Sequence, residues 1–448
     1  MNPLSELPQI EIILNDPSVS NWATLLSRPI VANIARDILG GVRTDYEKTG
    51  TVPESGEVIL AVASACETRA RRCLRRVINA TGVIVHTNLG RSPIRREVWR
   101  SAEELNVGYT NLELDLTSGK RGARGGIVPD LLSALTGAES ALVVNNGAAA
   151  LYLVLSALAN GREVVISRGE QVQIGGGFRI PEILKYSGAH LVDVGTTNVC
   201  TTSDYVEAVA ENTAMALVVH ASNFRMDGFT SKPHVKQIRK ELPDNVLLVV
   251  DQGSGATDES LAYERSVSVC LADGADLVCF SCDKLLGGPQ GGCVAGRRDL
   301  VEKLARHQLM RIIRPGKTVL SLLERHLAGI LNGTGTSIVR EKLDDREAEI
   351  RRRCFAVRRG VGADRIEIEK SKMAVGGGSA PGVELASWSV RFICDIPPAT
   401  VTEELRRHVV PIVAVTKHDS VLLNLGTVER SDLGSIIEAL RCIAEKDR

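Results

Sequence analysis

Short apolar runs, each followed by a stretch of helical character, constrain the fold of this chain more than any other feature. The runs are continuous rather than alternating, and they lie at 141–144, 164–166, 191–194, 216–220, 246–250 and 277–280. Strands that are apolar throughout are buried on both faces, which is typical of parallel strands joined by crossover helices. The sequence therefore predicts an α/β fold with a largely parallel central sheet covered by helices. Ligands of such sheets bind beyond the carboxyl ends of the strands.

The sequence divides into three expected domains. Residues 1–75 are helical, with one helix at 30–39 that Gly40 and Gly41 should end and a second at about 57–77. Residues 76–317 hold the predicted sheet, and residues 318–448 have the pattern of a smaller α+β domain. In that last domain, the glycine-rich stretch 372–381 is expected to be a mobile loop or a loop that wraps a substrate.

Charge restricts the partners. The 54 basic and 54 acidic side chains cancel, so a nucleic-acid contact would need a local basic patch. A solvated helix face and a phosphate-binding patch explain equally well the arginines at the end of the second predicted helix, Arg69, Arg71, Arg72, Arg75 and Arg76.

The chain lacks the pattern of a signal peptide, and no apolar stretch approaches the ~18–20 residues that span a bilayer. We therefore expect a cytoplasmic protein with no membrane partner. The ten cysteines are scattered, which favours reduced thiols. Cys279 and Cys282 have CxxC spacing but lie in and beside a predicted strand, and no second pair follows, so no metal site is expected.

Three predicted strands are followed by residues that could together bind one cofactor. Lys284 follows the run 277–280 and enters a turn rich in glycine, which suits a lysine that holds an aldehyde cofactor as a Schiff base. Asn145, Asn146 and Gly147 lead from another strand into a helix, whose first N–H groups could bind a phosphate. Asp251 ends a third strand and could pair with a protonated ring nitrogen.

Phosphate cradle, carboxylate and lysine in this chain order predict a pyridoxal-phosphate enzyme of the aminotransferase-like fold. Thirty-three residues separate Asp251 from Lys284, which allows one helix and one more strand and would place both at neighbouring strand ends. A nucleotide-dependent dehydrogenase is less favoured because neither G-x-G-x-x-G after an early strand nor a Walker motif is present. A noncatalytic binding module would not explain the three elements together.

Longer motifs add a resemblance over nearly the whole chain. They include Ile78-Asn-Ala-Thr-Gly82, His86-Thr-Asn-Leu-Gly-Arg91, His220 with Ser222-Asn223, and Asp283-Lys-Leu-Leu-Gly-Gly-Pro-Gln290. With these the chain resembles the bacterial selenocysteine synthases, the L-seryl-tRNA(Sec) selenium transferase family. The resemblance implies an aminotransferase-like fold of type I, pyridoxal 5'-phosphate as cofactor, seryl-tRNA(Sec) as partner and selenophosphate as selenium donor. It also implies a homo-oligomer built from dimers, and a helical N-terminal domain that binds tRNA.

The resemblance assigns roles to individual residues. Lys284 would carry the cofactor and move protons, with Asp283 assisting it. The cofactor would also contact Asp251, Ser222 and the turn Asn145, Asn146, Gly147 and Ala148, while selenophosphate would bind Arg91, Arg311 and Arg314. The last two lie three residues apart, so one helical turn would place them on the same side.

The chain departs from the family pattern at several positions. The family commonly has asparagine at Gly147, glycine at Cys282, a histidine near Ile127, and Leu-Asp-Leu-Arg where this chain reads Leu423-Asn-Leu-Gly426. An alternative is therefore a related pyridoxal-phosphate lyase that eliminates water or ammonia from a small amino acid or amino sugar phosphate and does not act on tRNA. A catalytically silent paralogue is a third reading, which the presence of Lys284, Asp251 and Arg311 disfavours.

Overall fold

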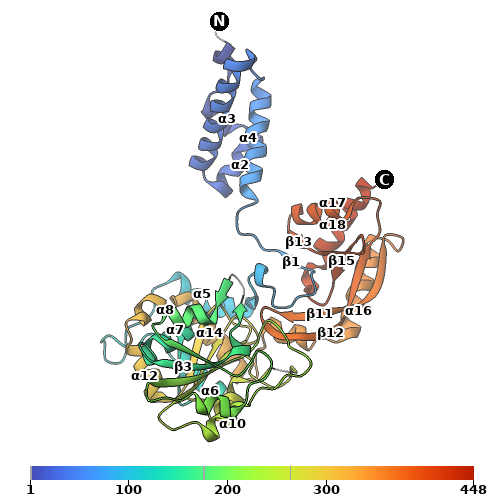
Figure 1. The fold of residues 1–448 in the computed structure, drawn as a ribbon. Coiled ribbons are helices and arrows are strands. Elements are labelled where there is room, and N and C mark those ends of the chain that lie inside the picture. Colours follow the sequence, from blue (N-terminus) through green and yellow to red (C-terminus); the bar gives the residue numbers. More distant parts are fainter. Residues whose placement is uncertain (1–2, 175–176, 263, 448) are drawn as a thin grey trace. The chain divides into compact units, whose positions relative to one another are not determined.

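The computed structural model describes residues 3–174, 177–262 and 264–447. The chain divides into two compact units, residues 1–76 and 77–448, and many of its elements are labelled in Figure 1. Within the described residues no helix is both long enough and apolar enough to cross a membrane.

The first unit is a bundle of α1 (Ile10–Asn15), α2 (Pro17–Leu26), α3 (Arg28–Thr49) and α4 (Ser55–Ala70), preceded by the 3₁₀ turn η1 (Pro3–Glu6). It has its own apolar core, to which Ile13, Val31 and Val62 contribute. Two expectations about its helices are wrong. Helix α3 runs through Gly40 and Gly41, which cost stability but do not break a helix, and it ends at Gly50 in the left-handed conformation. Helix α4 ends at Ala70, so Arg71 to Arg76 follow the helix instead of extending it.

The second unit is built on a seven-stranded sheet in the order β2-β10-β9-β8-β7-β3-β6. Six of these strands match the apolar runs: β2 (Ser140–Val144), β3 (Glu163–Ser167), β6 (His190–Val194), β7 (Thr213–Val219), β8 (Leu247–Gly253) and β9 (Leu277–Ser281). Sequence reasoning missed β10 (Gly292–Gly296), which pairs antiparallel with both β2 and β9. The short β-branched run Val83–His86, for which the sequence also predicts a strand, forms isolated bridges instead.

Both faces of this sheet are buried, as the continuous apolar runs predict. Along β9, Leu277 and Cys279 belong to one apolar cluster, while Val278 and Phe280 belong to another. The helices around the sheet are α5 (Arg96–Val107), α6 (Val128–Thr136), α7 (Gly147–Leu158), α8 (Ile180–Tyr186), α9 (Thr202–Glu207), α10 (Val235–Glu241), α11 (Val267–Ala272), α12 (Arg298–Arg306), α13 (Leu309–Ile313) and α14 (Lys317–Leu331). Short elements η2 (Thr87–Leu89), η3 (Arg168–Glu170), β4 (Gln173–Ile174) and β5 (Phe178–Arg179) lie in the connections.

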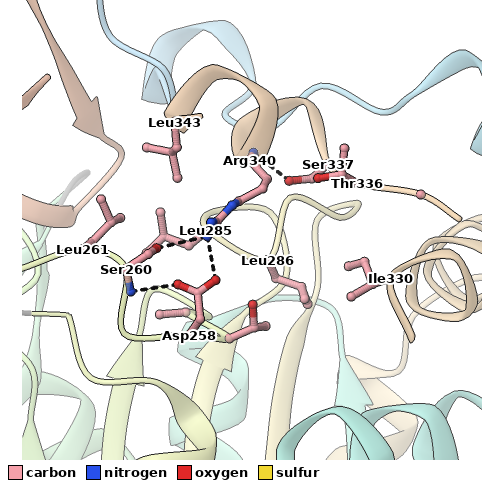
Figure 2. Close-up of a pocket in the computed structure, with 13 residues that line it drawn as sticks. Asp258, Ser260, Leu261, Leu285, Leu286, Ile330, Thr336, Ser337, Arg340 and Leu343 are labelled. Carbon is pink, nitrogen blue, oxygen red and sulfur yellow. Dashed lines mark hydrogen bonds and ion pairs between the residues drawn. The ribbon is translucent and has the colours of Figure 1, made fainter. Parts of the chain in front are cut away.

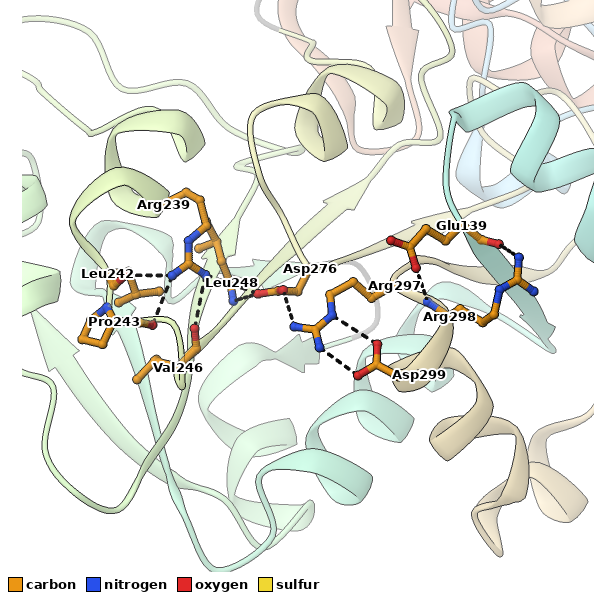
Figure 3. A network of polar contacts seen from close by, with 10 residues as sticks. All are labelled: Glu139, Arg239, Leu242, Pro243, Val246, Leu248, Asp276, Arg297, Arg298 and Asp299. Carbon is orange, nitrogen blue, oxygen red and sulfur yellow. Dashed lines mark hydrogen bonds and ion pairs between the residues drawn. The ribbon is translucent and has the colours of Figure 1, made fainter.

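A polar network pins the strands at the end of the sheet opposite the predicted site (Figure 3). Asp276, directly before β9, accepts hydrogen bonds from the backbone N–H of Leu248 at 2.7 Å and from Arg297 at 3.0 Å. Arg239 lies 3.5 Å from the same carboxylate and donates to the carbonyl of Leu242. The network joins β8, β9 and the end of β10, so it fixes the frame from which the opposite strand ends project.

The remaining elements are α15 (Ile338–Leu343), α16 (Glu347–Val361), β11 (Ile366–Gly376), β12 (Ser379–Phe392), α17 (Pro398–Arg407), β13 (Ile412–Val413), β14 (Val415–Lys417), β15 (Ser420–Asn424), η5 (Arg430–Asp432) and α18 (Leu433–Lys446). They form a second sheet in the order β11-β12-β15-β14. The early segment β1 (Ile78–Asn79) pairs in parallel with β13, and Ile84 and Val85 join the same core. Helix α14, in contrast, packs against α5 and α6 of the large sheet.

Candidate active site

Lys284 lies in the turn that follows β9, and its side chain is buried. The turn is held by hydrogen bonds from Leu285 N to Ser254 O at 2.9 Å and from Gly287 N to Lys284 O at 3.0 Å. Burial, reinforced by the charge of Arg91, lowers the pKa of Lys284, although Asp251 and Asp283 oppose the shift. The amine is therefore more readily neutral than that of an ordinary lysine.

Asp251 lies at the carboxyl end of β8, the strand next to β9, as the sequence spacing predicts. Burial raises the pKa of its carboxyl group to about 6, while Lys284 and His220 limit the rise. Among the described residues no side chain or backbone group donates a hydrogen bond to this carboxylate. Asp251 is partly buried, and a carboxylate withdrawn from water is costly unless a cationic group pairs with it.

Asp283 and Arg91 form the next part of the site. Arg91 Nη1 donates to Asp283 Oδ2 at 2.9 Å, and the N–H of Ser92 donates to the Asp283 carbonyl. The other carboxylate oxygen, Oδ1, is buried and has no hydrogen-bond partner in the described part of the chain. Residues 282–286 form a turn, so Asp283 and Lys284 do not lie on an extended strand.

The turn before α7 has the geometry of an anion cradle. Asn146 caps the helix by accepting a hydrogen bond from Ala149 N at 2.8 Å, and Asn145 N donates to the carbonyl of Ile313. The backbone N–H groups of Gly147 and Ala148 remain at the start of the helix, where they have no partner within it. A Cβ atom on Gly147 would lie 2.5 Å from Ser281 Oγ, so glycine keeps this corner open.

The three arginines predicted to bind selenophosphate contact different residues. Arg91 contacts Asp283 beside Lys284, whereas Arg311 and Arg314 line a pocket of about 600 Å³ that also contains Arg121 and Arg124. Arg314 lies 2.9 Å from Glu113, which also binds Arg121 and Arg124 at 2.7 Å. The Arg311 guanidinium makes no hydrogen bond or ion pair within residues 3–174, 177–262 and 264–447.

The glycine-rich stretch expected to be a loop is the tip of a β-hairpin, so the mobile-loop interpretation is wrong. Strands β11 and β12 pair along their length, and Gly376, Gly377 and Gly378 turn the chain with φ of 77°, 65° and 72°. A Cβ atom on Gly378 would lie 3.4 Å from Ser222 Oγ and 3.8 Å from Lys284 Nζ. The hairpin tip therefore borders the lysine, and buried Ser222 belongs to the same site.

Sequence reasoning did not assign a role to His220 or Glu264. His220 Nε2 lies 2.9 Å from Glu264 Oε1, and the N–H of His220 donates to the carbonyl of Asp251. One signal was available, since His220 ends an apolar strand in the same way as Asp251. Glu264 follows no such strand, and only the folded chain reveals its burial.

A second, smaller pocket of about 180 Å³ lies beside the lysine turn (Figure 2). Leu285 and Leu286 line one side, and Arg340 crosses it to bind Asp258 at 2.6 Å and Ser260 at 3.0 Å. Arg340 also binds Asp344, so its charge is already matched within the pocket. The charged side chains that line this pocket in the described part of the chain, Asp258 and Arg340, bind each other, so neither is free to bind a ligand.

The structure shows the surroundings of the residues that depart from the family pattern. Cys282 is buried, with its Sγ 3.3 Å from that of Cys293. No group of three or more histidine, cysteine or acidic side chains in the described residues could hold a metal ion. At Gly426, a Cβ would lie 2.6 Å from Ser387 Oγ and 2.7 Å from Met373 Sδ, so the position has room only for glycine. Ile127 is exposed, close in sequence to the arginine pocket.

Comparison with known proteins identifies the family. The family model described as L-seryl-tRNA selenium transferase matches residues 77–429. The chain belongs to the L-seryl-tRNA selenium transferase family. Among curated relatives, the L-seryl-tRNA(Sec) selenium transferase of Geobacter sulfurreducens is 38% identical, covering 99% of this chain and 100% of the relative. That of Geobacter metallireducens is 39% identical over the same shares.

Solved structures support the expected fold of this selenium transferase family member. A D-glucosaminate-6-phosphate ammonia-lyase covers 84% of this chain and 97% of its own, with a TM-score of 0.60 and 21% identity. At that identity the likeness concerns the fold alone. The fold is the aminotransferase-like fold of type I, and the prediction of an α/β architecture with a largely parallel sheet is confirmed.

Proposed function

We propose that this protein converts L-seryl-tRNA(Sec) to L-selenocysteinyl-tRNA(Sec), using pyridoxal 5'-phosphate as cofactor and selenophosphate as selenium donor. The observation that carries the proposal is the placement of Lys284 and Asp251 at neighbouring strand ends, in a chain that matches selenium transferases along nearly its full length. Because the reaction uses an aminoacyl-tRNA, we place the protein in the cytoplasm.

The residues present fit the cofactor. Asp251 is a partly buried carboxylate with no donor among the described residues, which suits a protonated ring nitrogen. The N–H groups of Gly147 and Ala148 at the start of α7 suit its phosphate, and Lys284 Nζ suits its aldehyde. Bound there, pyridoxal phosphate would supply an electron sink that makes the α-proton of the seryl group acidic.

The chain's own groups would do the rest of the work. Lys284, whose pKa burial lowers, would take the α-proton at Nζ and later return it. Arg91 would hold Asp283 in place beside it through their 2.9 Å contact. Arg311 and Arg314 would bind the doubly charged selenium donor, a role that fits the unpaired Arg311 guanidinium in the arginine pocket.

Exposed apolar side chains support a homo-oligomer. Val107, Tyr109, Leu116 and Ile312 are all exposed. Two contacts bring their segments together, since Lys317 Nζ donates to the carbonyl of Gly108 and Arg314 binds Glu113. We propose that a second copy covers this surface, which also adjoins the arginine pocket. Large apolar side chains of this kind are unusual on a free surface when they are close together.

The alternative is a lyase that acts on a small amino acid or amino sugar phosphate. It would use the same lysine and aspartate but would not need residues 1–76. The curated relatives do not favour it, because they are named as selenium transferases and match both units of the chain. The likeness to the ammonia-lyase concerns the fold alone.

A direct comparison of substrates tests the proposal. Purified full-length protein and Lys284→Ala are mixed with pyridoxal phosphate, and borohydride reduction followed by peptide mapping locates the attachment. Each protein then receives seryl-tRNA(Sec) with selenophosphate, or D-glucosaminate 6-phosphate. We expect cofactor on Lys284 and selenocysteinyl-tRNA from wild type only. Turnover of the sugar phosphate without tRNA turnover would replace the proposal with the lyase. A protein that takes up no cofactor would reject both.

A further inference from the structure

Glu264 is a buried carboxylate that none of the proposed catalytic roles uses. It lies in the connection between β8 and α11, and its side chain is fully shielded from solvent. Three groups converge on it. Ser254 Oγ donates to Oε2 at 2.7 Å, while His220 Nε2, at 2.9 Å, and the backbone N–H of Ala380 both contact Oε1.

The charge of the Glu264 carboxylate determines the role of His220 in their hydrogen bond. Burial alone would raise the pKa of Glu264, but the hydrogen bonds from His220, Ser254 and Ala380 outweigh burial and lower it. An ionised carboxylate can only accept hydrogen bonds. In its contact with Glu264, His220 Nε2 is therefore the donor and Oε1 the acceptor.

The three groups that donate to Glu264 come from three different segments around Lys284. The N–H of His220 donates to the carbonyl of Asp251, and the carbonyl of Ser254 accepts from Leu285, the residue after Lys284. Ala380 follows the hairpin tip, where Gly378 approaches Lys284 Nζ. Ala380 itself has a φ of 45°, a region that residues other than glycine seldom adopt, so the surroundings hold it there.

The contacts that would otherwise hold the hairpin lie further back along it. Ala374 N donates to Gly82 O and Val85 N donates to Val375 O, both before the turn. On the far side of the tip, the backbone N–H of Ala380 donates to Glu264, which lies in the connection that follows β8 of the large sheet. An isolated hairpin end has little stability of its own, so the carboxylate is well placed to hold it.

We propose that Glu264 is a positioning residue that fastens the β11–β12 hairpin tip over Lys284 and fixes the orientation of His220 beside Asp251. The proposal rests on the proposed function for the identity of the site. Fastening the tip keeps water away from Lys284, which its reduced basicity requires. It also joins the small sheet to the cofactor-binding strands at one buried point.

Two conservative substitutions of Glu264 separate the effect of side-chain length from the effect of charge. Glu264→Asp keeps the charge but shortens the side chain, so it cannot reach Ala380 and His220 together. Glu264→Gln keeps the length and one acceptor oxygen but loses the charge. Ser254→Ala is the control, because it removes one hydrogen bond to Glu264 and leaves the hairpin bond in place. All three are made in the full-length chain.

The main readout is hydrogen exchange of the backbone amides of residues 376–380 and 382, measured without tRNA or selenium donor; Pro381 has no amide hydrogen. We expect Glu264→Asp to speed exchange there roughly tenfold or more, as loss of a charged hydrogen bond should. Glu264→Gln and Ser254→Ala should stay within about threefold of wild type. Affinity for pyridoxal phosphate should follow the same order. Because exchange needs no turnover, it remains informative if the proposed reaction is not observed.

Equal exchange in wild type and Glu264→Asp would overturn the proposal. So would faster exchange spread evenly over β7, β8 and β9, or loss of the thermal transition in both Glu264 variants, since either result would make Glu264 a general core residue. The proposal predicts that the tip amides stay protected from exchange in Glu264→Gln and lose protection in Glu264→Asp. A residue that only stabilised the fold as a whole would not give this difference.

Discussion

Two lysines of the described chain are buried, and their surroundings give them different chemistry. Lys342 Nζ donates to the carbonyl of Val428 at 2.7 Å, and burial lowers its pKa to about 8. Lys284 is equally buried, but no described group accepts a hydrogen bond from its Nζ. A bonded amine braces the fold, whereas an unbonded one next to carboxylates is free to react.

Glu170 leads to a prediction about pH. It is buried after β3 and accepts hydrogen bonds from Val219 N at 2.8 Å and from Tyr205. Burial raises its pKa from 4.5 to about 7. A raised acid pKa contributes stability that is full below about pH 4.5 and is lost as the pH rises through 7. Relative to Glu170→Gln, the wild-type protein should therefore lose about 3 kcal/mol of unfolding free energy between pH 4.5 and 8.

Scanning calorimetry of both proteins across this pH range checks the Glu170 prediction. The glutamine variant keeps an acceptor for Val219 but has no proton to lose, so its transition temperature relative to that of wild type should rise between about pH 4.5 and 7 and level off above that range. Parallel curves for the two proteins would contradict the assignment of the raised pKa to Glu170.

At the residue scale, sequence reasoning found the groups that end apolar strands. Lys284 and Asp251 were predicted because each directly follows such a strand. Glu170 and Glu264 were not, because glutamate in a polar stretch is ordinarily solvated, and their burial arises from segments distant in the chain. The arginines were predicted as one group, yet Arg91 lies with Asp283 while Arg314 lies with Glu113.

Among the larger elements, the parallel strands could be predicted, and so could the apolar runs at 388–394 and 421–425 that became part of the antiparallel strands β12 and β15, whereas β10 and β11 could not. Strand β10 reads Gly-Cys-Val-Ala-Gly, and its end glycines resemble a turn in sequence. They are needed because a Cβ on Gly292 would lie 2.0 Å from Asn146 O and one on Gly296 would lie 2.1 Å from Asp276 O. The hairpin tip was mistaken for a loop for the same reason, since its glycines serve a tight turn.

A substitution in the hairpin tip separates backbone strain from crowding of the site. Gly378→Ala puts a Cβ near Lys284 and Ser222, and Gly333→Ala puts one into open space at a similar positive φ. Both should cost about 1–2 kcal/mol through the left-handed conformation. Only Gly378→Ala should also weaken pyridoxal-phosphate binding, by roughly tenfold.

Absorbance titration with the cofactor measures the affinity of both glycine variants, and thermal unfolding measures their stability. Equal losses of affinity in the two would mean that the effect is one of strain and not of the space next to Lys284.

At the scale of the whole molecule, the chain has two units with separate cores. We predict that residues 77–448 fold and bind pyridoxal phosphate without residues 1–76, with affinity within about threefold of the full chain. Under the proposed function they should lose most of their affinity for tRNA(Sec). Cofactor titration and a tRNA-binding assay at fixed salt check the two parts. A truncated chain that cannot bind cofactor would refute the independence of the two units.

The boundary near residue 76 could be predicted from a change in the sequence pattern. The packing of the helix that begins at residue 317 against the large domain could not. Helix α14 begins at that point and packs with α5 and α6, so the expected boundary falls at the start of a helix that packs on the large sheet. Its apolar face reads as helical in either domain, and only its neighbours determine which core it joins.

The pairing of β1 with β13 determines when each core can form as the chain is synthesised. The early segment also meets the end of the chain where Gly82 N donates to Thr427 Oγ1, 345 residues away. A nascent chain leaves the ribosome from its N-terminus, so the large sheet can assemble while residues 78–85 still lack their partners. The small core, to which the hairpin over Lys284 belongs, can be completed only when β13 and β15 have been synthesised, close to the end of translation. The lysine thus acquires its cover last, after the strands that position it are already in place.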